Sequence, residues 1–209
     1  MMRLTYFLAT VAALAFVAPA NAATLYNNPL LSGAIASPGS VGFTAASGGT
    51  SGALGFRLNG FASLDGVNFY EDDFTLALNG SPILTLSYDL GGEGGNVIFS
   101  NLYGATITGG TFGFFQGGAL DISIASLPLL VGNNSFTFSY DSPSGTALGG
   151  SGGHAGPQGT GDEAFGISNV LLTGTAVPEP ASWALMLVGF GIVGSAMRGR
   201  QRNVRVSFS

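Results

Sequence analysis

The chain has 209 residues, enough for one folded domain with appended segments, and it contains neither cysteine nor lysine. Disulfides, thiol chemistry, thiolate metal sites and lysine-based Schiff bases are therefore excluded. Between residues 23 and 177 one arginine stands against ten acidic residues, a net charge of −9, so we expect attraction for divalent cations and no binding of nucleic acid.

A secretory signal peptide is predicted at residues 1–22. Arg3 provides the positive start, and residues 4–17 form an apolar stretch that is short for a membrane-spanning helix. Residues 20–22, Ala-Asn-Ala, fit the small-residue pattern of a cleavage site. We therefore expect export through the inner membrane and removal of this segment; an uncleaved N-terminal anchor is the alternative interpretation.

Residues 23–176 are predicted to form an all-β domain. Four stretches alternate apolar and polar residues with the period of a half-buried strand, and no stretch has a convincing helical period. The residues expected to face the core are Phe74, Leu76, Leu78, Leu84, Leu86, Tyr88, Leu120, Ile122, Ile124, Phe136, Phe138 and Tyr140. Short strands separated by turn residues indicate an antiparallel β-sandwich with a jelly-roll-like arrangement.

Turn residues and weaker patterns add detail to this domain. Asn79 and Gly80 are a strong hairpin signal, and the following Ser81 and Pro82 are expected to lengthen the loop. Residues 23–52 are weakly patterned, and we expect one or two edge strands there.

The last strand is expected around residues 163–174. Phe165 and Ile167 share one parity, whereas Val170 and Leu172 take the other. This change of parity predicts a β-bulge near residues 168–169.

Three phenylalanines, Phe112, Phe114 and Phe115, lie between glycine pairs in the stretch GGTFGFFQGG. One interpretation is an exposed aromatic platform for sugar rings, or a hairpin that self-associates. We favour a strand that contributes two phenylalanines to the core, because a core needs large apolar side chains.

Few residues are candidates for catalysis. The single histidine, His154, lies in a glycine-rich loop, residues 142–161, and a serine triad would need that histidine held rigidly by an acid. We expect a solvated loop histidine instead. A two-carboxylate glycosidase has acids available, but no spacing singles out a pair, so no catalytic residue is assigned.

Two short acidic runs are the candidate metal ligands. Carboxylates on the loops of a secreted sandwich are the hard oxygen ligands that calcium prefers, and no EF-hand spacing is present. We expect Asp162 and Glu163 first, with Glu71, Asp72 and Asp73 as the second run. A structural calcium ion is thus the one cofactor considered; solvated turn residues without a metal are the alternative.

The C-terminal segment predicts a single transmembrane helix. Residues 181–197 form an uncharged stretch at the short end of what spans a bilayer, and Trp183 lies at its outer edge, where an indole suits the headgroup level. The arginines that follow should stay cytoplasmic, with residues 203–209 as a cytoplasmic tail.

Residues 177–184, VPEPASWA, followed by LMLVGFGIVGSAMRGR, resemble the PEP-CTERM protein-sorting domain in its PEP-x-x-W-A form. The matching residues are Pro178, Glu179, Pro180, Trp183, Arg198, Arg200 and Arg202. The resemblance implies that an exosortase of an exopolysaccharide-producing Gram-negative bacterium recognises the segment 177–202 and removes it. The helix would then lie in the inner membrane only before processing, and the product would reach the cell surface or the extracellular matrix. A plain anchor without processing is the alternative.

Two stretches of the body are similar to ectodomains that carry this sorting domain. TGDEAFGISNV is similar to their closing strand, DE-x-x-x-I-D-N-V, with Ser168 where an aspartate is common, and SLDGVNFYEDDFTLALNG contains their D-x-F-x-L-x-x-N-G pattern. The resemblance implies a β-sandwich, in some cases akin to carbohydrate-binding modules.

The predicted function is that of an exported surface or extracellular-matrix protein, a non-enzymatic binding or structural sandwich associated with exopolysaccharide. Its expected partners are an exosortase, the membrane through the C-terminal helix, and polysaccharide. A secreted glycoside hydrolase acting on matrix polysaccharide and a self-associating adhesive subunit are the alternatives.

Overall fold

The computed structural model describes residues 22–142, 148–149, 159–176 and 180–200. Residues 1–21 of the predicted signal peptide, the loop residue His154 and the predicted cytoplasmic tail lie outside these ranges. So do three residues of the sorting motif, Pro178, Glu179 and Arg202.

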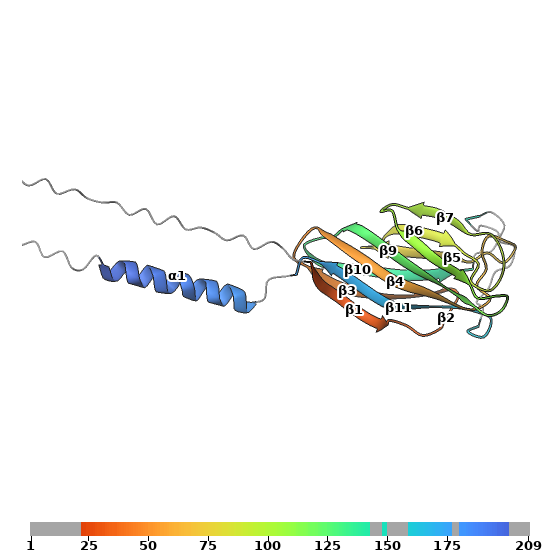
Figure 1. The fold of residues 1–209 in the computed structure, drawn as a ribbon, viewed down its shortest axis with the longest axis horizontal. Helices are drawn as coiled ribbons and strands as arrows, with labels where there is room; N and C mark the ends of the chain where they lie inside the picture. The colour runs from red at the N-terminus through yellow and green to blue at the C-terminus, as the bar shows by residue number, and fades with distance from the viewer. Residues whose placement is uncertain (1–21, 143–147, 150–158, 177–179, 201–209) are drawn as a thin grey trace, which may run out of the picture.

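Two antiparallel sheets form the body, with strands that run along its long axis (Figure 1). The first sheet has the order β1 (Ala23–Leu30), β11 (Glu163–Gly174), β4 (Ser51–Ala62), β9 (Gly118–Pro128), β8 (Thr106–Thr111), and β2 (Ile35–Ala36) also pairs with β11. The second has the order β3 (Gly39–Ser47), β10 (Gly132–Asp141), β5 (Asp73–Leu78), β6 (Ser81–Ser87), β7 (Val97–Asn101). The predicted all-β antiparallel body is confirmed. In the first sheet β11 lies between β1 and β4, and in the second sheet β10 lies between β3 and β5; this strand order is jelly-roll-like.

The core lies between the two sheets and follows the predicted alternation. Every residue expected to face the core is buried except Tyr88, which is half-buried. Phe43 stacks on Phe136 with ring centroids 4.8 Å apart, and Phe56 meets Phe138 edge-on at 4.9 Å. Each such ring contributes roughly 1.5–3 kcal/mol by leaving water, which explains how the body holds together without disulfides.

The hairpin between β5 and β6 is tighter than expected. Leu78 pairs with Ser81, so the loop has only two residues, Asn79 and Gly80. Both have a positive φ, 52° and 81°. The predicted lengthening of the loop is therefore wrong. The ladder absorbs Pro82 through an irregularity next to Ala77.

The bulge in β11 is confirmed. The register with β4 shifts between Ser168 and Leu171, and Asn169 has a φ of 53°. Phe165 and Val170 both reach the core as a result, although their parities differ. Residues 23–47 contain three strands, of which β1 and β3 are edge strands as expected.

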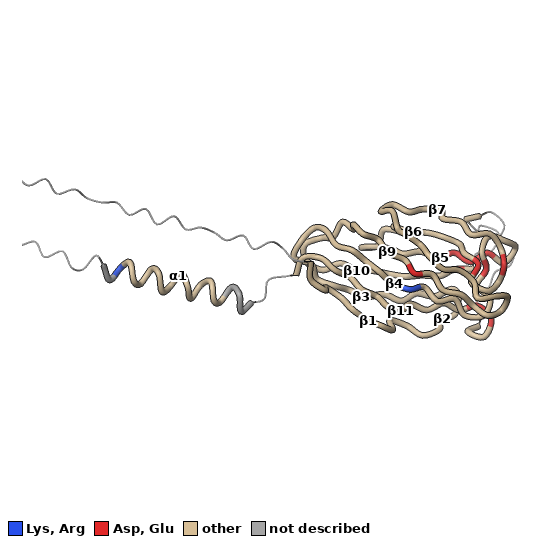
Figure 2. Tube along the Cα trace, in the orientation of Figure 1, with Lys and Arg blue, Asp and Glu red and all other residues tan. Residues whose placement is uncertain are grey.

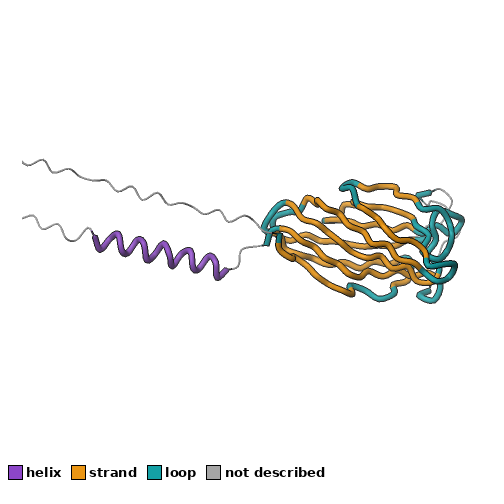
Figure 3. Tube along the Cα trace, in the orientation of Figure 1, coloured by secondary structure: helices purple, strands orange, loops and turns teal. Residues whose placement is uncertain are grey.

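The chain enters and leaves the sandwich at one end, which we call the terminal pole. Ala23 pairs with Gly174 there, and the amide of Gly48 donates to the carbonyl of Thr175 (Figure 1). The longer loops and most acidic residues gather at the opposite end, the loop pole (Figures 2 and 3). The loop pole is therefore the end of the sandwich where charged side chains meet.

A helix, α1 (Pro180–Arg200), covers the segment for which the sequence predicts one. Among the described residues, no helix combines the length and the apolar character needed to cross a membrane. The transmembrane role assigned to this segment therefore stays a prediction.

Candidate functional site

A cleft of about 720 Å³ opens at the loop pole. Four segments form it: the stretch after β4, the loop between β6 and β7, the loop between β8 and β9, and the start of β11. Its lining residues are Ser63, Asp65, Asn68, Phe69, Tyr70, Gly92, Glu93, Phe114, Phe115, Asp162 and Glu163. Aromatic rings and carboxylates thus share one cavity.

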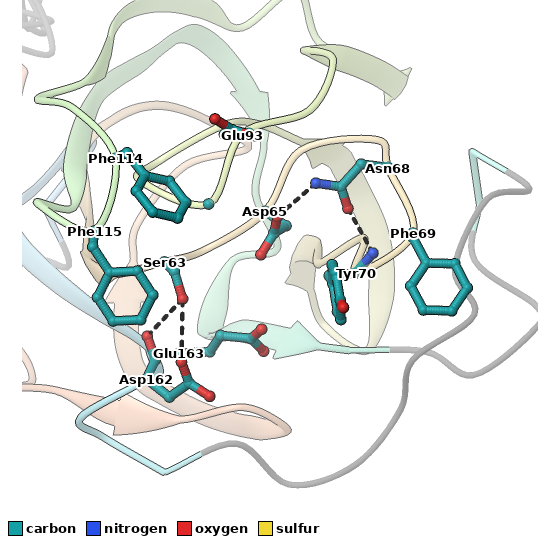
Figure 4. Close-up of a pocket in the computed structure, with 11 residues that line it drawn as sticks. Ser63, Asp65, Asn68, Phe69, Tyr70, Glu93, Phe114, Phe115, Asp162 and Glu163 are labelled. Carbon is teal, nitrogen blue, oxygen red and sulfur yellow. Dashed lines mark hydrogen bonds between the residues drawn. The ribbon is translucent and has the colours of Figure 1, made fainter.

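The aromatic side chains stand on two sides of this cleft. Figure 4 shows Phe114 and Phe115 on one side and Phe69 and Tyr70 on the other, with carboxylates between them. Phe114 and Phe115 are 66% and 52% exposed, and Phe112, outside the cleft, is 68% exposed. The prediction that this stretch supplies core phenylalanines is wrong, because the chain turns outward here and forms a loop.

Backbone contacts hold this aromatic loop above the cleft. The amide of Phe115 donates to the carbonyl of Gly91 at 2.7 Å, and the amide of Gly117 donates to the carbonyl of Ala62 at 2.9 Å. Gly91 has a φ of +120°, and a Cβ at this position would collide with the Ala62 carbonyl. Only glycine permits this close approach, so Gly91 helps to hold the loop that carries Phe114 and Phe115 in place.

Three buried carboxylates form what we call the inner acid cluster: Asp65, Asp72 and Glu163. Each offers an oxygen that lies within 4.8 Å of the oxygens of the other two. Asp65 and Glu163 also line the cleft, whereas Asp72 lies beneath them and is fully buried. The cluster therefore forms part of the floor of the cleft.

Among the described residues, few hydrogen-bond donors reach the inner acid cluster. The Ser142 hydroxyl contacts Asp72 and lies 3.2 Å from Glu163, but a serine has one proton and cannot donate to both. Asp72 also accepts from the amide of Asp65 at 2.9 Å. Protons or a cation must therefore balance the remaining carboxylate charge.

Burial raises the pKa of all three carboxyls, to about 7 for Asp65, about 8 for Asp72 and about 7 for Glu163. At Asp72 the charge of Glu163 raises the pKa further. At Asp65 the hydrogen bond from Asn68 acts in the opposite direction. Near neutral pH the cluster thus holds protons that a divalent cation could displace.

Among the described residues of the body, no arginine is free to neutralise the cluster. Arg57 is the one arginine between residues 23 and 176, and it forms a bidentate pair with Asp121, with contacts of 2.8 and 2.7 Å. This pair joins β4 to β9 across the exposed face of the first sheet. A set of carboxylate oxygens without a basic partner fits a hard cation such as Ca²⁺.

The two acids expected as the first metal ligands lie in different surroundings. Glu163 begins β11 and joins the inner acid cluster, whereas Asp162 is exposed at the rim of the cleft, 3.4 Å from the Ser63 hydroxyl. Asp72, from the second run, joins the cluster, and Asp65 was not predicted. No local pattern singles out Asp65, since the fold brings it to the others.

Residues 176–202 match the PEP-CTERM protein-sorting motif. The chain therefore carries this sorting signal at the place where its residues resemble one. Among curated proteins none matches the chain.

The sandwich has weak similarity to solved carbohydrate-binding modules. The CBM36-1 domain of a multidomain xylanase from the hindgut metagenome of Trinervitermes trinervoides is 11% identical, with a TM-score of 0.35 over 76% of this chain and 100% of that chain. A family 35 module from an environmental isolate is 14% identical, with a TM-score of 0.34 over 74% and 93%. A CBM36 module in complex with calcium and xylotriose is 8% identical, with a TM-score of 0.31 over 74% and 98%. TM-scores this low assign no ligand to the chain.

Proposed function

We propose that this protein is an exported, non-enzymatic surface or matrix protein that binds polysaccharide in the cleft at the loop pole. The cleft itself carries the proposal: exposed aromatic rings on two sides enclose a floor of carboxylates. Flat apolar rings pack against the apolar faces of sugar rings, and carboxylates accept hydrogen bonds from sugar hydroxyls. A soluble protein rarely exposes this many rings in one place without a partner.

The charge of the cleft narrows the class of ligand. Four of its described lining residues are acidic, namely Asp65, Glu93, Asp162 and Glu163, and none of the described lining residues is basic. Such a cleft repels phosphate and uronate groups, so neutral polysaccharide is the proposed ligand and nucleic acid is not.

A calcium ion at the inner acid cluster is part of this proposal. Asp65, Asp72 and Glu163 would hold it, and their shortage of hydrogen-bond donors supports its presence. The ion would offset the repulsion among three buried carboxylates and stiffen the floor of the cleft.

The sorting motif supports export and processing. We propose that residues 1–22 are removed during export and that residues 23–176 form the exported body. An exosortase would recognise residues 177–202 while the tail is held at the inner membrane. The body would then reach the cell surface or an exopolysaccharide matrix. The match at residues 176–202 supports this route.

A glycoside hydrolase remains the alternative that an experiment must separate from binding. Such enzymes place two carboxyl groups on either side of the scissile bond. Here three carboxylates converge on one point, with Asp72 fully buried beneath the other two, which favours a cation over a catalytic pair.

The test is affinity electrophoresis of the purified protein in gels that contain neutral, uronate-rich or amino-sugar polysaccharide, with calcium or with EDTA. We expect a neutral polysaccharide to retard the protein, more strongly with calcium. Absence of retardation by every neutral polysaccharide would refute the binding proposal. Release of reducing ends during incubation would establish the hydrolase instead.

A further inference from the structure

Four buried side-chain oxygens in the described residues lack a hydrogen-bond partner. They are Glu71 Oε2, Asp73 Oδ1, Ser87 Oγ and the Tyr140 hydroxyl. Buried polar atoms in folded proteins are almost always paired, so unpaired ones indicate a missing partner. The first three belong to one place in the fold.

Glu71, Asp73 and Ser87 gather on the outer face of the second sheet, at its loop-pole end. Phe74 and Leu86 pair across β5 and β6 and face the core. One step further along the same register, Asp73 stands opposite Ser87, and both side chains point away from the core. Glu71 lies two residues before Asp73, and the consecutive amides of Leu148 and Gly149 donate to the carboxylates of Asp73 and Glu71.

A short segment of the chain covers this place. The amide of Leu148 donates to Asp73 Oδ2 at 3.3 Å, and the amide of Gly149 donates to Glu71 Oε1. A Cβ at Gly149 would lie 2.5 Å from Glu71 Oε2, so Gly149 packs directly against this carboxylate. One oxygen of each carboxylate is therefore held by the backbone, and the other is buried without a donor.

We propose that Glu71 Oε2, Asp73 Oδ1 and Ser87 Oγ, which we call the outer oxygen group, bind a second divalent cation with the coordination chemistry of calcium. All three ligands are hard oxygens and two of them belong to carboxyl groups. Each of the three residues is more than nine-tenths buried. Their unpaired state is an observation independent of their acidity. Backbone carbonyls or water would complete the coordination sphere.

A shared proton is a weaker explanation of the same atoms. Burial and the neighbouring Glu71 carboxyl raise the pKa of Asp73 to about 6, and a proton shared by these two carboxyls would pair one oxygen of each. A single proton would still leave the Ser87 hydroxyl without a partner. A cation satisfies all three oxygens and binds residues 148–149 to the sheet through the carboxylates that hold them.

The second cation is separate from the one proposed at the inner acid cluster, so either proposal can fail alone. Isothermal calorimetry of the metal-stripped full chain with CaCl₂ should resolve two binding events, the outer one with a dissociation constant on the order of 0.1–1 mM. The double variant Glu71→Gln/Asp73→Asn should lose the binding event at the outer oxygen group and keep the one at the inner acid cluster. Asp72→Asn should lose the event at the inner acid cluster and keep the one at the outer oxygen group. Asp121→Asn, an equal change of charge on the exposed surface, should keep both.

Ser87→Ala provides a test that does not depend on removing charge. This variant deletes one unpaired hydroxyl and should fold normally. We expect roughly tenfold weaker binding at the outer oxygen group alone. The proposal is overturned if the wild type shows a single event that Asp72→Asn abolishes, if both events survive in the double variant, or if Ser87→Ala leaves both affinities unchanged.

Discussion

Asp72 and Asp73 are consecutive in the chain, yet their carboxylates lie on opposite faces of the same strand end. Asp72 accepts from the amide of Asp65 and contacts Ser142 inside the sandwich, whereas Asp73 accepts from the amide of Leu148 outside it. The two-residue period of an extended chain explains the separation. One acidic run thus supplies two distinct sets of oxygen ligands.

The variant Asp72→Asn should affect stability in opposite directions with and without calcium. In EDTA at neutral pH we expect a higher melting temperature than the wild type, because the buried Asp72 carboxyl must take up a proton on folding and an asparagine need not. At calcium 100 times its dissociation constant, the ion at the inner acid cluster should add about 2.7 kcal/mol, or roughly 5–10 °C, to the wild type, and the variant should lack this gain and keep only the gain from the outer oxygen group. Differential scanning calorimetry measures both; a wild type indifferent to calcium would contradict a cation at the inner acid cluster.

The metal-free protein should become less stable as the pH rises from about 4 to about 8. Burial raises the folded-state pKa of Asp65, Asp72 and Glu163 above the unfolded values, so the folded state binds more protons in this window. Stability is then highest below the unfolded values and is lost as the carboxyls ionise. Urea denaturation in EDTA at pH 5 and pH 8 measures the effect. Equal midpoints at the two pH values would show that these carboxyls titrate normally.

Removal of the cleft aromatics should weaken polysaccharide binding without loss of the fold. We expect Phe114→Ala and Phe115→Ala each to weaken binding about tenfold, equivalent to about 1.4 kcal/mol. Phe112→Ala is the matched control, since Phe112 lies in the same loop and is at least as exposed as the other two rings but does not line the cleft. Affinity electrophoresis gives the dissociation constant of each variant for the polysaccharide. An equal effect of all three variants would argue against the cleft as the binding site.

The close approach of Gly91 to Ala62 should tolerate no side chain. We expect Gly91→Ala to cost roughly 1–3 kcal/mol, because the residue has a φ of +120° and its Cβ would collide with a carbonyl. Gly55→Ala is the control, since nothing lies within 4 Å of a Cβ at that position in β4. Thermal unfolding compares the two variants. Similar small losses in both would mean that the loop relaxes around residue 91.

The sorting segment should be removed in the native host. Mass spectrometry of protein from cells and medium should find neither residues 1–22 nor the segment beyond the Pro-Glu-Pro motif. Trp183→Ala, or deletion of residues 178–180, should leave the tail attached and the protein in the membrane fraction, whereas Leu187→Ala should be processed. Retention of residues 198–205 by the wild type would make the tail a plain anchor.

The strands with strict alternation were predictable because each core face is encoded locally. Phe136, Phe138 and Tyr140 all point into the core, as their spacing indicates. The central strand β4 was missed, although Leu54, Phe56 and Leu58 alternate there, because glycines interrupt its apolar pattern. Glycine in a strand weakens the pattern without preventing pairing on both sides.

The candidate site depends on contacts that a linear pattern does not contain. Asp65 follows β4, Asp72 precedes β5 and Glu163 begins β11, and they meet because the two sheets close over one pole. The exposure of Phe114 and Phe115 likewise depends on how the glycines of their loop turn the chain. The composition predicted that the site would be built from residue types such as carboxylates and aromatic rings. Where these side chains meet depends on the topology of the two sheets.

The pairing of Ala23 with Gly174 has a consequence for how the protein works when its tail is held at a surface. The strand β4 has 12 residues and runs between the two poles, so the cleft lies roughly 40 Å from the point of attachment. A tethered molecule would therefore present its cleft outward, clear of the surface that carries it. Neighbouring copies could line up side by side with every cleft still accessible to a long polymer passing above them.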